Sequence, residues 1–372
     1  MKVPVVVIGA GLAGLRIASL LASQGIECRV LEARSRTGGR ILTKGVAGQE
    51  PLGTYDLGPT WFWPEDQPRI SRLITELGLR TFAQATQGVM LVERLRHERP
   101  QRCASSGDTT TGALRLVEGT GVLIDALGAT LPEGVVQTDA SVTSIRQEST
   151  ESVAIEIGNE GDTLRASVAV VALPPRLAAQ RIRFDPALPS DLCASLLSKP
   201  TWYGGQAKAV AVHDRPFWRE AGLSGFATSA AGPLAEIHDA SPPSGAGALV
   251  GFFVLPPKER QELGEGAVRD LVAKQLTRLF GSPAAHPIAL LYKDWATDPE
   301  TAVEDDLQPT NADPAYGPPS NAPIWNGRLV FAGTETAPEH GGYLEGALLS
   351  AESAVSQIIA ALESREGGVL RG

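Results

Sequence analysis

The amino-acid sequence predicts an α/β fold in which a Rossmann-like nucleotide-binding domain is interleaved with a smaller α+β domain on a mixed or antiparallel sheet. Three observations lead to this prediction. The four β-branched residues 5–8 are typical of a buried central parallel strand. A glycine-rich turn and an apolar helix follow this strand directly, as in a βαβ unit. Alternating strands at 201–295 then separate these elements from a last apolar helix that begins near residue 344.

The turn after the first strand carries three glycines at G-x-G-x-x-G spacing: Gly9, Gly11 and Gly14. The first permits the tight turn, the second lets a pyrophosphate approach the backbone, and the third lets helix and strand pack closely. The helix at 12–21 presents free N–H groups to the phosphates. A second strand at 26–31 ends in Glu32, which is placed to accept hydrogen bonds from a ribose. This order of elements predicts a dinucleotide site.

Length, charge and cysteine content exclude several classes of protein. The 372 residues suffice for two domains, and the net charge of −9 argues against nucleic-acid binding. No apolar run is long enough to span a membrane, and the first strand begins too early for a signal peptide to precede it. The cysteines Cys28, Cys103 and Cys193 have no metal or redox spacing. We therefore expect a cytoplasmic protein with no metal, no nucleic-acid partner and no membrane association.

A second glycine-rich segment lies at 33–40, shortly after the acidic residue. Its paired glycines, the second of them Gly39, permit close approach of the backbone to a ligand. Arg40 can bind a phosphate with both arms of its guanidinium group. Alone, this segment would indicate a loop with a surface arginine. Directly after the first motif it predicts a second pyrophosphate contact, with Arg34 and Arg40 as candidate cofactor-binding residues.

Together these motifs resemble those of the flavin-containing amine oxidases, the family of monoamine oxidases, polyamine oxidases and L-amino-acid oxidases. Residues 56–61 (DLGPTW) are similar to the family's segment that runs past the flavin ring. Residues 329–336 (LVFAGTET) and 342–347 (GYLEGA) resemble its second flavin signature. The matches span the chain from end to end. The resemblance implies a Rossmann-like FAD-binding domain of the glutathione-reductase type.

The resemblance also implies further contacts with FAD. Glu335 would accept hydrogen bonds from the sugar-alcohol chain of the flavin. The amide of Leu344, at a helix N-terminus, would stabilise the negative charge of the reduced ring. The alternative is a capped C-terminal helix without a ligand. The other implied cofactor-binding residues are Gly58, Thr60, Trp61, Gly333 and Gly342, with Val142 against the adenine.

Lys208 is the most informative single residue, because it interrupts an apolar strand pattern at 207–212. A lysine in such a strand usually lies at a sheet edge or faces solvent. In the resembled family, a lysine ahead of a Pro-Phe-Trp sequence, here residues 216–218, holds a water beside flavin N5. Burial would lower its pKa, so that it could assist proton handling or oxygen activation. We favour this catalytic interpretation.

Two aromatic residues complete the implied catalytic set. Tyr343 would be one wall of the family's aromatic cage, which steers an amine nitrogen towards the flavin, and Trp295 would lie close to the flavin in the same site. Cation–π attraction explains why aromatic walls suit an amine. The alternative is that both residues belong to the core.

The segment at 299–306 departs from the family pattern. It has neither the second cage tyrosine nor the cysteine that some members join covalently to the flavin. We therefore expect non-covalent FAD and an incomplete aromatic cage. Its acidic run, Glu304, Asp305 and Asp306, would hold the second cationic group of a diamine or polyamine, or else form a solvated surface, which is the interpretation we favour.

A second departure is length, because residues 84–116 stand where the family normally inserts a sizeable helical block. That block roofs the substrate channel in the family. Without it the flavin face should be more open, admitting a bulky or carrier-tethered amine, or leaving the site to be roofed by a second subunit of a homo-oligomer.

The expected layout is discontinuous. Residues 1–80, 118–199 and 297–365 would form the FAD-binding domain, 81–117 and 200–296 the substrate domain with a reduced helical lid, and 366–372 a tail. The stretches 117–121 and 245–247 superficially imitate further dinucleotide loops but lack the third glycine and the preceding strand. A separate NAD(P)H domain is therefore not expected.

The leading hypothesis is FAD-dependent oxidation of an amine C–N bond to an imine. Hydride transfer to flavin N5 would be followed by hydrolysis of the imine, with reoxidation by O2, giving H2O2, or by another acceptor. One alternative is a renalase-like or desaturase-like flavoprotein that acts on NAD(P)H or another non-amine substrate. A second alternative is a non-catalytic flavin-binding protein.

Overall fold

Strand β1 (Lys2–Ile8) lies inside an eight-stranded sheet of the computed structural model. The structure describes residues 2–104, 109–158, 161–243, 245–308 and 314–369. Val5, Val6 and Val7 are fully buried, as their β-branched run predicts. Several predicted segments extend outside the described residues: the tail at 370–372, the FAD-binding domain at 159–160 and 309–313, and the substrate domain at 105–108 and 244.

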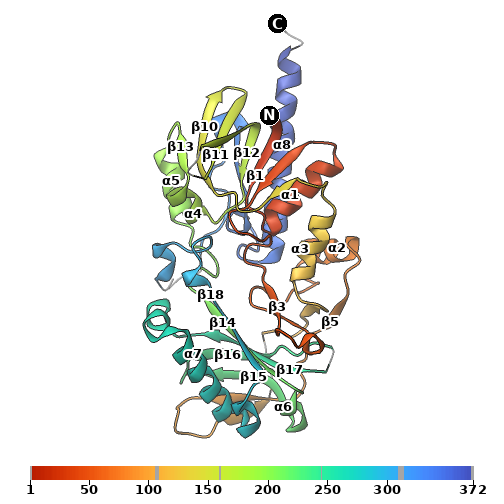
Figure 1. The fold of residues 1–372 in the computed structure, drawn as a ribbon, viewed down its shortest axis with the longest axis vertical. Coiled ribbons are helices and arrows are strands. Elements are labelled where there is room, and N and C mark those ends of the chain that lie inside the picture. Colours follow the sequence, from red (N-terminus) through yellow and green to blue (C-terminus); the bar gives the residue numbers. More distant parts are fainter. Residues whose placement is uncertain (1, 105–108, 159–160, 244, 309–313, 370–372) are drawn as a thin grey trace.

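The eight-stranded sheet is mixed (Figure 1). Strand β1 pairs in parallel with β2 on one side and with β12 on the other, whereas β10, β11 and β12 form an antiparallel meander. The order along the sheet is β13-β10-β11-β12-β1-β2-β9, with β19 also pairing in parallel with β12. The bounds are β2 (Cys28–Leu31), β9 (Val136–Gln137), β10 (Val142–Ser149), β11 (Ser152–Ile157), β12 (Asp162–Val171), β13 (Arg183–Asp185) and β19 (Leu329–Phe331).

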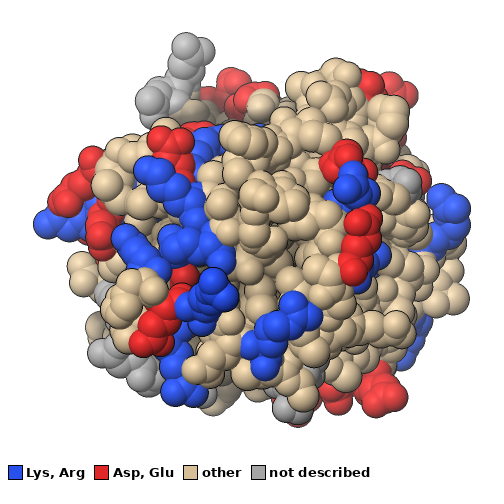
Figure 2. Space-filling view, turned by 90° about the horizontal axis from the view of Figure 1, so that it is seen from below, with Lys and Arg blue, Asp and Glu red and all other residues tan. Residues whose placement is uncertain are grey.

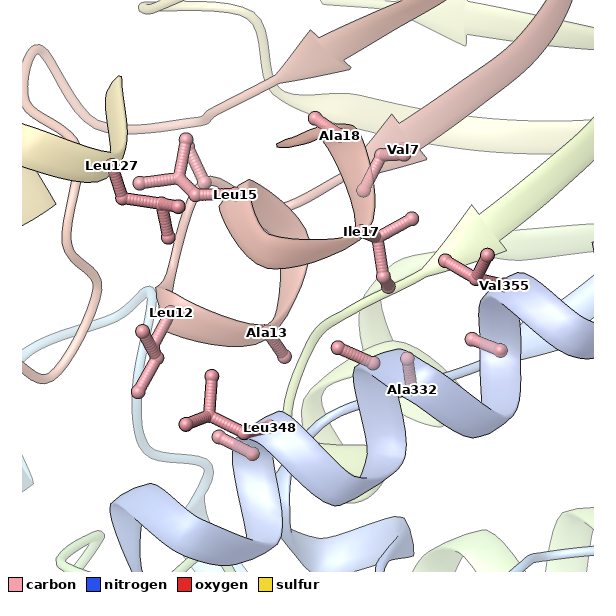
Figure 3. Packing of buried hydrophobic residues seen from close by; sticks show 14 of the residues in the cluster. Val7, Leu12, Ala13, Leu15, Ile17, Ala18, Leu127, Ala332, Leu348 and Val355 are labelled. Atoms are coloured by element: carbon pink, nitrogen blue, oxygen red, sulfur yellow. The ribbon is translucent and has the colours of Figure 1, made fainter. Parts of the chain in front are cut away.

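The side chains of β1 alternate between the two faces of this sheet, and helices cover both faces. Val5 and Val7 join the cluster formed with α1 (Leu12–Ser23), α2 (Pro68–Glu76), α3 (Gly121–Ala129) and α8 (Leu344–Val369). Val6 and Ile8 join the opposite cluster, with α4 (Pro175–Arg181) and α5 (Ser190–Leu197). Figure 3 shows the contact of α1 with α8, in which Ala13 and Ile17 point towards Leu348 and Val355. Helix α8 extends to Val369, into the 366–372 segment that we expected to be a tail.

The second sheet has seven strands in the described part of the chain and lies below the first in Figure 1. Its order is β18-β14-β17-β16-β15-β6-β7, and every pairing is antiparallel except that of β6 with β15. The mixed sheet of the predicted fold class is thereby confirmed. The bounds are β6 (Val89–Glu93), β7 (Gln101–Ala104), β14 (Ala207–His213), β15 (Leu223–Ser229), β16 (Leu234–Asp239), β17 (Gly247–Phe253) and β18 (Ala289–Asp294).

The two faces of the second sheet meet different partners. Ala207, Ala209 and Ala211 of β14 pack towards α7 (Pro257–Phe280), whereas Val210 and Val212 pack with the segment that contains Tyr55 and Leu57. Lys208 shares the parity of the second group, so its side chain leaves the sheet on the side of the 55–60 segment. The far end of this sheet, seen from below in Figure 2, is a surface of mixed charge on which Lys and Arg side chains gather along one side.

The remaining elements are short. They are β3 (Thr43–Gly45) with β4 (Thr54–Asp56), β5 (Thr81–Ala83) with β8 (Leu114–Leu116), helix α6 (Phe217–Glu220), and single turns of 3₁₀ helix at Glu50–Leu52, Ser282–Ala285, Trp295–Thr297, Glu304–Leu307, Trp325–Gly327 and Thr334–Thr336. None of the helices in the described residues is long and apolar enough to cross a membrane. The residue boundaries of the two domains stay predictions.

Candidate active site

A cavity of about 410 Å³ collects most of the residues that the sequence motifs single out. Its wall includes Gly9, Gly11, Glu32, Arg34, Gly39, Arg40, Thr60, Trp61, Val142, Gly333, Gly342, Tyr343 and Leu344. Of the other candidates, Gly14, Gly58, Glu335, Lys208 and Trp295 lie outside the wall and contact residues that belong to it or flank it. The cavity therefore joins the first glycine motif, at Gly9 and Gly11, to the aromatic residues Trp61 and Tyr343.

The three glycines of the first motif have three different surroundings. Gly9 has φ +104°, and a Cβ there would lie 2.7 Å from the carbonyl oxygen of Ala172. A Cβ on Gly14 would lie 1.9 Å from the carbonyl oxygen of Gly9, so helix α1 and strand β1 are in direct backbone contact. A Cβ on Gly11 would meet no atom within 4 Å. The space in front of Gly11 is thus open cavity, as a pyrophosphate requires.

The same end of the cavity offers both donors and a fixed carboxylate. Gly11 is the N-cap of α1 and makes no side-chain capping bond, so the first N–H groups of the helix have no capping partner. Glu32 accepts the Ala10 N–H through Oε2 at 2.8 Å and the Arg34 N–H through Oε1 at 3.0 Å. Each carboxylate oxygen retains a lone pair for a ribose hydroxyl. These residues fit the adenosine and pyrophosphate parts of FAD.

Arg34 connects this end to the segment that follows β18. Its Nη2 donates to Asp298 Oδ1 at 2.6 Å and to Thr301 Oγ1 at 2.8 Å. Asp298 also accepts from Lys293 Nζ at 2.8 Å. Burial opposes the charge of Asp298, but the Lys293 hydrogen bond and Arg34 outweigh it and lower the pKa of the carboxyl. This network was missed at the sequence level because Arg34 lies 264 positions from Asp298 and 267 from Thr301.

Arg40 and Glu335 form a two-pronged ion pair beside the cavity. Arg40 Nη1 lies 2.5 Å from Glu335 Oε1, and Nη2 lies 3.0 Å from Oε2. Glu335 is completely buried. Burial opposes the charge of Arg40, but Glu335 outweighs this effect and raises the pKa of the guanidinium group. In the structure the charged groups of Arg40 and Glu335 bind each other. The expected contacts of both residues with FAD stay predictions.

The backbone of Trp202 binds both members of this ion pair. Its N–H donates to Glu335 Oε1 at 3.1 Å, and its carbonyl oxygen accepts from Arg40 Nη1 at 2.8 Å. The indole and the ring of Tyr343 are stacked, with centroids 6.2 Å apart and an interplanar angle of 28°. Trp202 and Tyr203 both line the cavity. Neither was singled out from the sequence, although two adjacent aromatic residues before Gly204-Gly205 and the lysine strand were a usable signal.

Lys208 is fully buried on the inner strand β14, which pairs with β17 and β18, so the alternative of an edge or solvent-facing lysine is wrong. Its Nζ donates to the Gly58 carbonyl and to Thr60 Oγ1, both at 2.6 Å. Burial lowers the pKa of Lys208 from its usual value of 10.5 to about 7, with Asp56 opposing this effect and Arg115 adding to it. Lys208 therefore holds the 58–60 segment at the cavity wall and titrates near neutrality.

The pKa of Lys208 predicts a pH-dependent stability. Between about pH 7 and 10.5 the unfolded chain holds a proton on this lysine that the folded chain has lost. The free energy of unfolding should therefore rise with pH in this window by about 1.4 kcal/mol per unit from this group. Lys208→Met removes the titration from both states. Urea unfolding of both proteins across the window should give a stability difference that changes in favour of the wild type as pH rises; a difference independent of pH would contradict the assignment.

Trp295 is also fully buried and lies next to the same segment. Its Nε1 donates to the Leu57 carbonyl at 3.0 Å, and Lys293 Nζ lies 4.7 Å from its ring centroid. Trp295 and Lys208 thus bind consecutive carbonyl groups, those of Leu57 and Gly58. Tyr343 differs from both, because 46% of its surface is exposed and it lines the cavity. The interpretation of Tyr343 as a core residue is wrong, whereas Trp295 is both buried and close to the site.

Asp306, in the acidic run after Trp295, is neither free to hold a cationic group of a substrate nor part of a solvated surface. This carboxylate is buried, and Oδ1 accepts from Arg176 Nη1 and from the Thr201 N–H, each at 2.9 Å. Its role in the structure is to fix the 200–206 loop. Glu304 and Asp305 are exposed, and Asp305 accepts from Gln180 Nε2 at 2.9 Å.

The contrast between Gly11 and Gly14 gives a matched pair of variants. Gly11→Ala is compatible with the backbone, because φ is −75° there and the methyl group would project into open cavity. We expect it to fold with wild-type stability and to bind FAD at least about tenfold more weakly, because the methyl group occupies the phosphate position. Gly14→Ala should instead destabilise the fold by about 1–3 kcal/mol. Urea unfolding and fluorescence titration with FAD measure both effects, and equal loss of stability in the two variants would contradict this assignment.

Comparison with known proteins finds two family models and several relatives that match this chain. Residues 101–359 match the family model for the flavin containing amine oxidoreductase, and residues 7–77 match that for an NAD(P)-binding Rossmann-like domain. A putative flavin-containing monoamine oxidase, AofH, of Mycobacterium tuberculosis (strain ATCC 25618 / H37Rv) is 27% identical over 467 aligned positions, covering 97% of each chain. The putrescine oxidase of Kocuria rosea is 25% identical, covering 96% of this chain and 95% of its own.

Solved structures agree with the fold. Wild-type putrescine oxidase bound to putrescine superposes with a TM-score of 0.80 at 21% identity, covering 97% of this chain and 99% of the other. Cyclohexylamine oxidase from Brevibacterium oxydans IH-35A gives a TM-score of 0.81 at 20% identity, covering 98% and 100%. At these identities the likeness establishes the fold, and the two-sheet arrangement is that of the FAD-dependent amine oxidases.

Proposed function

This chain belongs to the flavin containing amine oxidoreductase family, and from that premise we propose that it holds FAD non-covalently in the 410 Å³ cavity and oxidises the C–N bond of an amine to an imine. Water then hydrolyses the imine. The observation that carries this proposal is the continuity of the cavity. One wall joins the open backbone at Gly11 and the fixed carboxylate of Glu32 to the aromatic rings of Trp61 and Tyr343.

The chemistry that FAD supplies when bound is the acceptance of a hydride equivalent and the return of its electrons to an acceptor such as O2. The protein's own part begins with Lys208. A neutral lysine amine has two N–H donors and one lone pair, and both donors are occupied by Gly58 and Thr60. The lone pair is then free to accept a proton or to hold a water. Because the pKa is about 7, both protonation states are populated near neutral pH.

Helix α8 (Leu344–Val369) contributes electrostatic stabilisation. Leu344 is its first residue and lines the cavity next to Tyr343. The positive end of the helix dipole therefore faces the cavity and favours negative charge that develops there. The Leu344 amide is the group we assign to this role.

The positions of the cysteines support non-covalent attachment of FAD. Cys28 is in β2, Cys103 in β7 and Cys193 in α5, and none of them belongs to the cavity wall in the described part of the chain. Burial raises the pKa of the Cys28 thiol to about 11, which suppresses its reactivity. The three free thiols also support a cytoplasmic location.

An anaerobic titration tests the proposal. The purified yellow protein is mixed separately with aliphatic and aromatic amines, polyamines, amino acids and NAD(P)H, and the flavin absorbance is followed. We expect bleaching by an amine, and recovery in air with release of H2O2. Acid precipitation should release the flavin into solution. Bleaching by NADPH alone would favour the renalase-like alternative, and a protein that takes up no FAD would overturn the proposal.

A further inference from the structure

We propose that Trp202 is a substrate-contacting residue, and that its indole and the Tyr343 ring together form the surface against which the amine is held. This inference rests on the proposed function. It assigns the second aromatic wall to the 200–206 loop, whereas the resemblance placed it in the segment after Trp295, where this chain has no aromatic residue at 299–306. Trp202 would then decide which amines bind productively.

The first argument is exposure within the cavity. Trp202 is 37% exposed and Tyr343 46% exposed, although both are large aromatic residues, and both line the 410 Å³ cavity. Their ring centroids lie 6.2 Å apart at an interplanar angle of 28°, so the two rings lie together at one wall of the cavity. Apolar surface of this size normally becomes buried when a ligand is present to cover it. An amine is a suitable ligand, because its nitrogen is attracted to ring faces and its carbon chain to the ring area.

The second argument is that the position of Trp202 is fixed by several independent contacts. Both of its backbone polar groups bind the Arg40–Glu335 pair, at 2.8 Å and 3.1 Å. Asp306 accepts the N–H of the preceding Thr201 at 2.9 Å. A Cβ on Gly342 would lie 2.8 Å from the indole, so the ring packs directly on the backbone next to Tyr343. A wall held in this way can orient a substrate.

The third argument is the backbone of the next residue. Tyr203 has φ +70°, a conformation that bulky residues rarely adopt. The turn that contains it is closed by the Gly204 N–H, which donates to the Thr201 carbonyl at 2.9 Å. This turn brings Trp202 and Tyr203 to the cavity together. Strain of this kind persists where the surrounding structure requires it, and here it places two adjacent rings at one wall.

The test measures binding by the holoenzyme without turnover. Benzyltrimethylammonium carries an aromatic group and a permanent positive charge, and it has no nitrogen lone pair from which oxidation could proceed. Its Kd is measured by isothermal titration calorimetry with the wild type, Trp202→Phe and Trp202→Leu. We expect Trp202→Phe to stay within about threefold of the wild type and Trp202→Leu to bind about tenfold more weakly, because leucine keeps apolar bulk but removes the aromatic face.

Trp325→Leu is the matched control, because Trp325 packs on Phe184 and does not line the cavity. It should leave the Kd for benzyltrimethylammonium unchanged. Equal affinity of wild type and Trp202→Leu, both loaded with FAD, would overturn the inference, as would a wild type that does not bind the ligand. Neither result bears on the proposed function, which the anaerobic titration tests separately. It is supported if an amine bleaches the flavin and overturned if none does.

Discussion

Replacing Lys208 by methionine is expected to lower kcat/KM for amine oxidation by about 10²- to 10⁴-fold, the range usual for loss of a group that transfers a proton. The variant should still bind FAD, because Lys208 does not line the cavity. Its Nζ lies behind the wall, where it donates to the Gly58 carbonyl and to Thr60 Oγ1, and its pKa of about 7 allows it to exchange a proton near neutral pH. Stopped-flow reduction of the flavin by an amine measures the effect directly.

The pH profile separates a chemical role from a structural one. In the wild type, kcat/KM should rise with pH through an apparent pKa of about 7, as Lys208 loses its proton. This limb should be absent in Lys208→Met, whose residual rate would depend on pH only through the substrate. Lys274→Met is the control, because Lys274 is exposed on α7. A limb near pH 7 that persists in Lys208→Met would assign the titration to another group.

The nucleotide end of the site could be predicted because its residues follow one another in the sequence. The motif of Gly9, Gly11 and Gly14 needs only its own strand and helix to be interpreted, and the structure gives each glycine a distinct surrounding. Glu32 lies at the end of the adjacent parallel strand, where the spacing places it. Local patterns are informative when the partners are local.

The other end of the site depended on contacts between distant parts of the chain. Propensity alone suggests that a lysine in an apolar strand is exposed, and Lys208 is buried because its partners Gly58 and Thr60 come from 150 and 148 positions away. The pairing of Arg40 with Glu335, across 295 positions, likewise could not be inferred from either motif. Trp202 was missed for the same reason, since the adjacent aromatic residues mark the 200–206 loop but do not show that Trp202 meets Tyr343.

Arg40→Met should be the most destabilising single substitution considered, at about 3–5 kcal/mol. It would leave Glu335 completely buried without its ion-pair partner, and among the described residues the Trp202 N–H would be the remaining donor to its carboxylate. The double variant Arg40→Met with Glu335→Gln should recover part of this loss, because a neutral amide is much cheaper to bury than a carboxylate. Urea unfolding at a fixed excess of FAD, with FAD affinity determined separately, gives the free energies.

The control for this cycle is Arg165→Met, since Arg165 pairs with Glu148 at 2.9 Å but its side chain is 56% exposed. Its loss should be within about 1 kcal/mol of zero. If Arg40→Met were equally mild, the guanidinium group would not be what compensates the charge of Glu335. Because the same pair holds the backbone of Trp202, a large loss of stability should be accompanied by weaker amine binding in the variant that still retains FAD.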